Sequence, residues 1–368
     1  MMEKQHTNST MVKLSAISPY MAENIVKSTE IKDKQRDYII WGEGNQYPNY
    51  LYSLYGNCAT LQTIINGTQE YVMGSDITIT ADLLNGTVNK KGDTFRDIVS
   101  KLVMDYLIFG GYAFQVIRNP FNEIKEIYYI DILKLRSDEK NEVFYYSDDW
   151  YTKSYGRIKT LVYPKFSPND TNPTSIFFYK GNITRNTYPV CRWGSAVLSA
   201  EIEKSIDEYH LNELNNNFMS SAIINFNNGV PDEQQQLEIE NKITEKFSGK
   251  ENAGRILIAY NDSKDNALTL ERLNTDDYAD RYNNLAKRSR EQLFIAFRAV
   301  PVLFGLMTEN NGFSREEFLQ AFELYNKTTI QPIQRIMIET FDTLTGINNS
   351  FSFVPFEITD KETISGNE

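Results

Sequence analysis

The sequence is poor in the residues from which most catalytic and metal sites are built. Its 368 residues include two cysteines, Cys58 and Cys191, and two histidines, His6 and His210. Two distant cysteines are too few for a disulfide framework or a thiolate zinc site, and they are typical of a reducing compartment. Two histidines far apart exclude a histidine-based triad or metal centre. We therefore expect no metal and no cofactor, and two cysteines that serve as small buried apolar residues.

The sequence also lacks a long hydrophobic run. The nearest candidate is LFIAFRAVPVLFGLM, residues 293–307, which Arg298 and Pro301 interrupt. It is shorter than the roughly 18 to 20 apolar residues that a membrane-spanning helix needs. The opening MMEKQHTNST is polar and has no apolar core of a signal peptide. These absences predict a protein without a membrane contact.

Positive charge is scarce as well. The chain has 38 Lys and Arg against 49 Asp and Glu, a formal net charge of −11. A protein that grips nucleic acid neutralises phosphates with Lys and Arg, and so tends to be basic. This chain therefore has no role with nucleic acid, or it handles the polymer without holding it tightly. Aromatic residues, in contrast, are plentiful, with 23 Tyr and 21 Phe, and they suit both cores and subunit interfaces.

Enzyme motifs are absent or incomplete. No G-x-x-x-x-G-K-[ST] phosphate loop occurs, and GEGNQYPN (42–49) contains G-x-G without the third glycine of a dinucleotide site. Three acid pairs could be metal ligands of a nuclease, but each also fits a turn or the first turn of a helix: Asp148–Asp149, Asp276–Asp277 and Glu316–Glu317. We expect no enzymatic activity, and keep a DNA-processing enzyme with a carboxylate-bound metal as the alternative.

Residues 1–35 are polar and predict a loosely held arm, and residues 36–194 predict an α+β domain. IVSKLVMDYLIF (98–109) has helical spacing and is followed by two glycines that suit a helix end. Segments rich in Val, Ile and Tyr then predict β-strands between Asn-Pro and Ser-Asp turns: 112–119, 124–137, 142–153 and 175–180.

Two long helices are predicted to bracket a small α/β module. The first, within 195–220, has apolar residues at four- or eight-residue intervals, and His210 continues this series as a packed or interface residue. The module, 221–273, reads strand (222–227), helix, strand (255–260) and strand (267–273). The second helix, 274–300, begins at Asn274 with acids in its first turn. The module has too little core of its own to stand alone.

Basic residues gather in the second long helix: Arg281, Lys287, Arg288, Arg290 and Arg298. One interpretation is a solvated face that complements the helix dipole. The other is a surface near nucleic acid or an acidic neighbouring subunit, formed by Arg281, Lys287, Arg288 and Arg290. The chain then closes with a helix over 315–331, a break at Pro332, a helix over 332–345 ended by Gly346, and a short acidic tail.

Residues 213–334 contain an ordered set of motifs. These are a glycine turn, a helix ending in FSG (247–249), NAGR (252–255), AFRAVPVLFG (296–305), GFSREEF (312–318) and TIQPIQ (329–334). In this order they resemble the portal, or head–tail connector, proteins of long-tailed bacteriophages and prophages. The resemblance is good over about 120 residues, whereas the domain before residue 190 matches only in its strand-rich character.

The resemblance implies a portal-type fold and a homo-oligomeric ring, usually a dodecamer, at one capsid vertex. Residues 36–194 would be the wing, 195–220 and 274–300 the stem helices, 221–273 the clip, 301–313 a channel loop, and 314–368 the upper wing and crown with the tail. Double-stranded DNA would pass through the ring during packaging and ejection. The partners would be the terminase or packaging ATPase, the major capsid protein and a head–tail adaptor. The protein would lie in the virion after assembly in the bacterial host cytoplasm.

The stretch VPVLFGLMTENNGFSREEF (300–318) holds the candidate channel loop. Pro301 is predicted to stop the preceding helix. Ser314 and Glu317 form an S-x-x-E capping box, with Phe313 and Phe318 placed for a hydrophobic staple, so the next helix should begin at a defined place. Between these ends we expect Met307, Thr308, Glu309, Asn310 and Asn311 to lie nearest the DNA, which they would guide without gripping. The alternatives are an ordinary helix–helix turn here, and for the whole chain another phage head–tail adaptor or structural protein.

Overall fold

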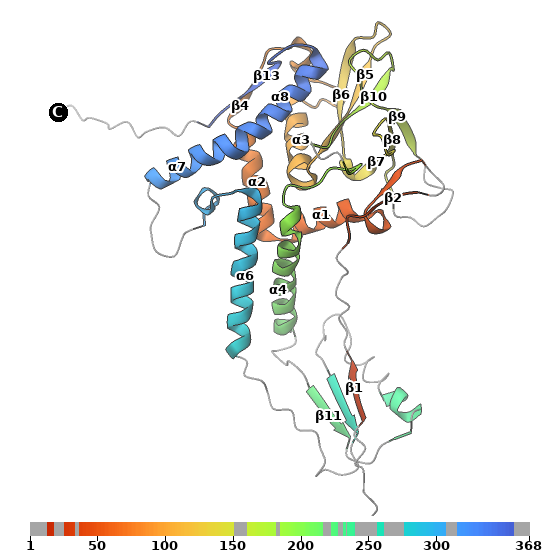
Figure 1. The fold of residues 1–368 in the computed structure, drawn as a ribbon, viewed down its shortest axis with the longest axis vertical. Helices are drawn as coiled ribbons and strands as arrows, with labels where there is room; N and C mark the ends of the chain where they lie inside the picture. The colour runs from red at the N-terminus through yellow and green to blue at the C-terminus, as the bar shows by residue number, and fades with distance from the viewer. Residues whose placement is uncertain are drawn as a thin grey trace, which may run out of the picture. The chain divides into compact units, whose positions relative to one another are not determined.

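The structure is a computed structural model whose helices and strands are shown in Figure 1. It describes residues 13–17, 26–33, 37–150, 160–181, 185–215, 222–226, 231–232, 234–239, 256–260, 276–306 and 315–356. The chain divides into two compact units, one of residues 1–25 with 202–287 and one of residues 26–201 with 288–368. Within the described residues, no helix is both long and apolar enough to cross a membrane.

The larger unit is built on helices α1 (Tyr47–Asn57), α2 (Ala59–Met73) and α3 (Phe95–Phe109). The predicted helix over 98–109 is confirmed, but it begins three residues earlier. Thr94 and Asp97 form a capping box there, each side chain bonding to the other's backbone amide. At the other end Gly110 takes the left-handed conformation, where a Cβ would lie 2.1 Å from the carbonyl oxygen of Val190. Only glycine fits this approach.

In the part of this unit that the structure describes, four small antiparallel sheets accompany these helices. Their orders are β10-β5-β6, β7-β8-β9, β2-β3 and β13-β4. The strands are β2 (Glu30–Lys32), β3 (Ile39–Trp41), β4 (Asp76–Ile79), β5 (Tyr112–Arg118), β6 (Ile124–Ile130), β7 (Leu135–Ser137), β8 (Val143–Tyr146), β9 (Leu161–Pro164), β10 (Thr174–Tyr179) and β13 (Phe351–Val354). The single strand predicted over 124–137 is wrong. A 3₁₀ turn splits it, because the Asp131 side chain accepts a hydrogen bond from the Leu133 amide.

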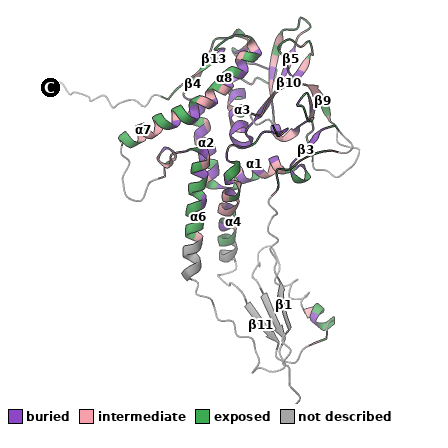
Figure 2. Cartoon of the chain, in the orientation of Figure 1, coloured by how far each residue is buried: buried purple, intermediate pink, exposed green. Residues whose placement is uncertain are grey.

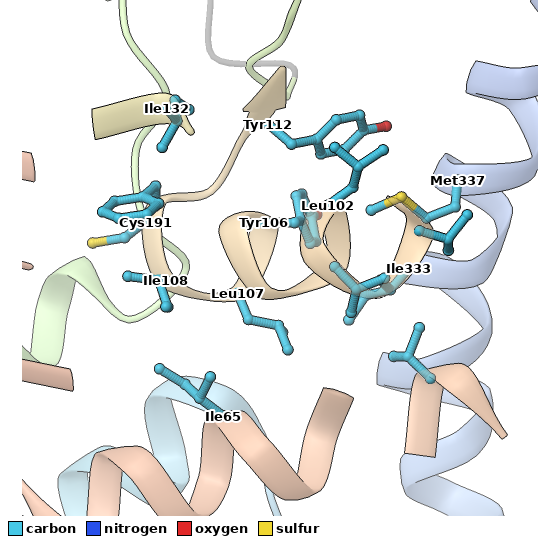
Figure 3. Close-up of a cluster of buried hydrophobic side chains, with 14 of the residues drawn as sticks. Ile65, Leu102, Tyr106, Leu107, Ile108, Tyr112, Ile132, Cys191, Ile333 and Met337 are labelled. Atoms are coloured by element: carbon cyan, nitrogen blue, oxygen red, sulfur yellow. The ribbon is translucent and has the colours of Figure 1, made fainter. Parts of the chain in front are cut away.

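The core of this unit joins α3 to the C-terminal helix α8 (Gln331–Thr345). Figure 3 shows Leu102 and Tyr106 of α3 beside Ile333 and Met337 of α8. Figure 2 shows buried residues along α2 and α3, and Phe341 of α8 is fully buried against aromatic rings. Tyr112 and Thr340 add a buried hydroxyl–hydroxyl bond of 2.7 Å. Helix α8 is therefore fixed to the core along its length.

The smaller unit holds a three-stranded sheet of order β1-β12-β11. Strands β11 (Ala222–Phe226) and β12 (Ile256–Tyr260) are parallel, a pairing that requires a long connection such as the one between them, and both confirm predicted strands. The third strand is β1 (Lys13–Ile17), antiparallel to β12. The N-terminal arm was not predicted to supply a strand, and the strand predicted over 267–273 lies outside the described residues.

Helices α4 (Val197–Asn215) and α6 (Asp276–Phe297) confirm the two predicted long helices. The division between the two units falls within both. In the smaller unit Tyr209 stacks on Tyr282 with ring centroids 4.9 Å apart, and His210 contacts the same ring at 5.9 Å. His210 is exposed, so its predicted role as a packed or interface residue stays a prediction.

The break predicted at Pro332 does not occur. Helix α7 (Arg315–Tyr325) continues through a π-helical segment, Asn326–Ile330, into α8. Pro332 has no amide hydrogen, and its ring would clash with the carbonyl four residues earlier in an α-helix. The wider π turn just upstream relieves that clash, so the chain stays helical.

A buried carboxyl group in α3 is incompletely paired. Asp105 is 5% exposed and accepts a hydrogen bond from the Tyr129 hydroxyl at 3.1 Å. Its second oxygen, Oδ2, has no hydrogen-bond partner among the described residues. Burial first, and then the negative charge of Asp131, raise the pKa of Asp105 well above the ordinary value of 3.8.

Asp105→Asn should therefore stabilise the protein at neutral pH. With its folded-state pKa raised, Asp105 contributes stability below the ordinary carboxyl pKa, and that contribution is lost as the pH rises through the folded-state value. Asparagine does not titrate, so the variant should gain about 1–2 kcal/mol at neutral pH and nothing in acid. Thermal unfolding followed between about pH 4 and pH 8 checks this. An equal offset at every pH would contradict it.

Candidate functional site

The residues predicted to form the channel loop, Met307, Thr308, Glu309, Asn310 and Asn311, lie outside the described residues, as do Phe313 and Ser314. What the structure does describe is both ends of segment 307–314. The end before it comprises residues 298–306, and the end after it begins with α7 at Arg315.

Helix α6 ends before Pro301, so the prediction that this proline stops it is wrong. The helix ends at Phe297, and Arg298 follows with a φ of 54°. The Ala299 amide donates to the Phe294 carbonyl at 2.9 Å and the Arg298 amide to the Ile295 carbonyl at 3.0 Å. These two bonds are those of a Schellman motif, with arginine where glycine is usual. Since a left-handed arginine gives no sequence signal, the pattern alone could not place this end.

Pro301 instead begins a short 3₁₀ helix, Pro301–Phe304. Proline suits the first helical position because its missing amide hydrogen would have no partner there, and its fixed φ is already helical. Gly305 then reverses the chain in the left-handed conformation. These caps hold the chain in one conformation up to Leu306, immediately before segment 307–314.

Both ends of the segment meet a single group of residues on α2 and its neighbours. We call this group the loop clamp, and it consists of Gly67, Thr68, Tyr71, Phe304, Phe322 and Tyr325. All six lie in the larger unit. Gly67, Thr68 and Tyr71 come from α2, Phe304 precedes segment 307–314, and Phe322 and Tyr325 follow it in α7.

Tyr71 contacts both ends of the segment. Its hydroxyl donates a hydrogen bond of 2.8 Å to the carbonyl oxygen of Leu303, and its ring lies edge-on to Phe304 with centroids 6.1 Å apart. The same ring approaches Phe322 at 5.7 Å and Tyr325 at 6.2 Å. One half-buried side chain of α2 therefore ties the entry of the segment to its exit.

A buried hydrogen bond closes the exit side. Tyr325 is 1% exposed, and its hydroxyl lies 2.7 Å from the Thr68 hydroxyl. A tyrosine hydroxyl is protonated at neutral pH in any case, and burial raises the pKa of Tyr325 further, to about 12. The rings of Phe304 and Tyr325 also lie edge to face with centroids 5.8 Å apart, so residues on the two sides of the segment contact each other directly.

Gly67 provides the space for Phe304. A Cβ on Gly67 would lie 2.9 Å from both Cδ1 and Cε1 of the Phe304 ring, closer than carbon atoms pack. The ring therefore lies directly against the backbone of α2. Glycine inside a helix is less stable than alanine by up to about 1 kcal/mol. The packing of the Phe304 ring against the α2 backbone, which only glycine permits, offsets this loss of helix stability.

The basic residues of α6 do not form one stripe. Arg288 and Arg290 are both exposed, and two residues along a helix place them about 160° apart around its axis. Lys287 is exposed too, and six residues separate it from Arg281, about 120° around the axis. Only the backbone of Arg281 is described. A role of these four residues at a channel or between subunits stays a prediction.

Two of the acid pairs weighed as metal ligands have other contacts or positions in the described residues, and the side chains of Asp276 and Asp277 lie outside them. Asp148 is exposed and binds Lys134 at 2.9 Å and the Tyr146 hydroxyl at 3.1 Å. Glu316 and Glu317 occupy the first turn of α7, where the helix dipole favours acids. In the described part of the chain, no group of three His, Cys, Asp or Glu residues is placed to hold a metal ion.

Sequence reasoning missed the surface that holds the residues on both sides of segment 307–314. Gly67, Thr68 and Tyr71 lie on an ordinary amphipathic helix more than 200 residues before Phe304, with no motif around them. The available signal was a glycine inside a helical pattern, which is often kept for a close packing contact.

Gly67→Ala should loosen the loop clamp, and Gly56→Ala is its matched control. Both glycines lie in helices, but a Cβ on Gly56 would meet nothing within 4 Å. Gly56→Ala should therefore raise the stability by about 0.5–1 kcal/mol. Gly67→Ala should gain nothing, or destabilise, because Phe304 must move. Thermal unfolding of both variants checks this, and an equal rise in both melting temperatures would show that Phe304 is not held against α2.

Comparisons with known proteins agree with this architecture. No curated protein sequence matches the chain significantly. Among solved structures, the neck of a native gene transfer agent particle computed with C12 symmetry matches with a TM-score of 0.51 and 13% identity, over 92% of this chain and 88% of that one. A portal protein of the HK97 family from Corynebacterium diphtheriae matches with a TM-score of 0.45 and 10% identity, over 83% of this chain and 94% of that one.

The comparison with protein families is more specific than the comparison with solved structures. The model of the phage portal protein family matches residues 74–361, which include α2's C-terminal flank, both long helices, segment 307–314 and α8. That span is well over half of the 368 residues. The chain therefore belongs to the phage portal protein family, whose place is a vertex of the capsid.

Proposed function

We propose that this chain assembles with copies of itself into a ring, a dodecamer, through which double-stranded DNA is packaged and later ejected. Membership of the portal family supports the ring. The C12 symmetry with which the similar gene transfer agent neck was computed supports twelve copies. In this proposal residues 36–194 form the wing, 195–220 and 274–300 the stem, 221–273 the clip, and 314–368 the upper wing and crown with the tail.

The loop clamp is the observation that carries the proposed DNA contact. It fixes both ends of segment 307–314 to one helix, through the Leu303 carbonyl on one side and Tyr325 on the other. A segment whose ends are held while its middle is polar, LMTENNG, is suited to contact a moving polymer. We infer that Met307, Thr308, Glu309, Asn310 and Asn311 lie nearest the DNA.

The negative net charge of the chain is suited to a channel through which DNA slides, and not to tight DNA binding. Lysine and arginine contacts neutralise phosphates and strengthen binding, which would act as a brake on DNA that must slide. The net charge is −11, and residues 307–311 carry no positive charge. The segment would thus guide the duplex with neutral and acidic groups. The ring itself would perform no catalysis, and a separate terminase ATPase would supply the work.

The remaining partners follow from the same proposal. The ring would contact the major capsid protein at the vertex, the terminase during packaging, and a head–tail adaptor afterwards. It would be assembled in the bacterial host cytoplasm and remain in the virion.

Electron microscopy of the purified protein tests the ring. Negative-stain images should show rings with a central hole. Solid particles of another shape would favour a different head–tail adaptor or structural protein. Monomers under all assembly conditions, together with Mg²⁺-dependent nuclease activity, would favour the carboxylate-metal enzyme and overturn the portal assignment.

Deleting residues 308–311 tests the DNA contact. The deletion should leave ring assembly intact, because the clamp residues are untouched, and should impair DNA packaging or retention. Replacing Asn310 and Asn311 by lysine keeps the length and should slow packaging in a salt-dependent way, since new phosphate contacts weaken with salt. Serine at both positions is the matched control and should package normally. Normal packaging by the deletion variant would refute the contact.

A further inference from the structure

The helix that follows segment 307–314 changes its geometry at one place. From Arg315 to Thr345 it is continuous, but over Asn326–Ile330 it is π-helical, and the Gln331 amide donates to the Asn326 carbonyl five residues back. A π turn accommodates one more residue than the α-helix it interrupts. If α8 continued backwards as a regular α-helix, the residues of α7 would lie one residue position away from where they are, about 100° around the helix axis.

The two flanks of the π-helical segment are held very differently. Helix α8 buries Ile333, Met337 and Phe341 completely, and Gln334 also bonds to the Val72 carbonyl at 2.8 Å. In α7 the only fully buried side chain is Tyr325. Leu324, its neighbour, is 60% exposed. Helix α8 is thus fixed to the core, whereas α7 is held chiefly through the loop clamp.

Hydrogen bonding within the segment is also incomplete. The Thr328 hydroxyl bonds back to the Leu324 carbonyl at 2.8 Å. The Thr329 hydroxyl is buried and has no hydrogen-bond partner among the described residues. Such back-bonding competes with the regular helix pattern, and an unpaired buried hydroxyl costs free energy. Both features weaken the segment, so the contacts on either side of it help to keep its π geometry.

Pro332 and the clamp together keep it. In an α-helix the Pro332 ring would clash with the Thr328 carbonyl, which disfavours loss of the π turn. If the π turn were lost without a change in residue number, α7 would rotate about 100° and move about 1.5 Å along its axis. Asn326 would then take the position of Tyr325, and Glu323 that of Phe322. The aromatic contacts with Tyr71 and the bond to Thr68 would be lost.

We propose that residues 326–330 are a register-shift hinge with two states, one clamped and one released. In the clamped state the π turn presents Tyr325 and Phe322 to Tyr71, which also binds the Leu303 carbonyl. In the released state the helix is α-helical throughout, and α7 has rotated so that Tyr325 and Phe322 no longer face Tyr71. This inference rests on the proposed function for its purpose, which is to let segment 307–314 change position as DNA moves, but the hinge itself concerns the free chain.

Pro332→Ala should populate the released state. Alanine removes the clash, so α-helical geometry becomes available at the same residue number, and the clamp opens more often. Hydrogen–deuterium exchange read by mass spectrometry should show peptides 299–306 and 315–325 exchanging about tenfold faster than in the native chain, since proline disfavours the α-helical interior far more than alanine does. Peptides of α8 beyond residue 333 are the internal reference and should not change.

Deleting Thr328 in the Pro332→Ala background should reverse the effect. The deletion removes the extra residue, so a regular α-helix again brings Tyr325 and Phe322 to the clamp, and exchange in both peptides should return to the native rate or below. If Pro332 only stabilises the helix, the opposite order is expected. Exchange in the two peptides would then be unchanged or slower in Pro332→Ala and faster after the deletion. Thr343→Ala, on the exposed side of α8, controls for a general effect of substitution.

Unchanged exchange in Pro332→Ala, or faster exchange in the double variant than in Pro332→Ala, would overturn the hinge. If the double variant does not fold, the Pro332→Ala result alone decides. The measurement uses the free protein without DNA, so its failure leaves the DNA contact standing. Normal packaging by the 308–311 deletion, conversely, would remove that contact without touching the hinge.

Discussion

The contact of Tyr71 with both ends of segment 307–314 is the constraint on which the account depends. The helix that carries it, α2, is fixed in the core, so whatever Tyr71 holds is fixed with it. Through one hydroxyl and one ring, the end of the 3₁₀ helix and the last turn of α7 are brought together. The residues on either side of segment 307–314 are therefore held close to each other.

The acidic character of the chain is consistent with this arrangement. Proteins that hold DNA do so with Lys and Arg, whose phosphate contacts dominate affinity. In the proposed conduit, a chain with a net charge of −11 would guide DNA by geometry rather than by charge. The relevant forces are then steric guidance and weak polar contacts, and precision at the base of the segment matters more than the charge at its tip.

Local signals in the sequence predicted much of the fold, and non-local packing decided the rest. Helix α3 and strands β5 and β10 were predicted because spacing, Gly110 and turn residues lie within a few positions of them. The end of α6 was misplaced because Arg298 adopts a conformation that glycine usually marks. The clamp could not be predicted, because Thr68 and Tyr325 are separated by 257 residues and no pattern in the sequence links them. The same is true of the pairing of β1 with β12.

The most direct measurement of the central claim is a cryo-electron microscopy structure of the assembled ring containing DNA. We expect residues 307–311 to form the part of each subunit nearest to the channel axis, with Tyr71 still bonded to Leu303 at their base. A structure in which these residues lie on the outer surface, or between subunits away from the axis, would contradict it.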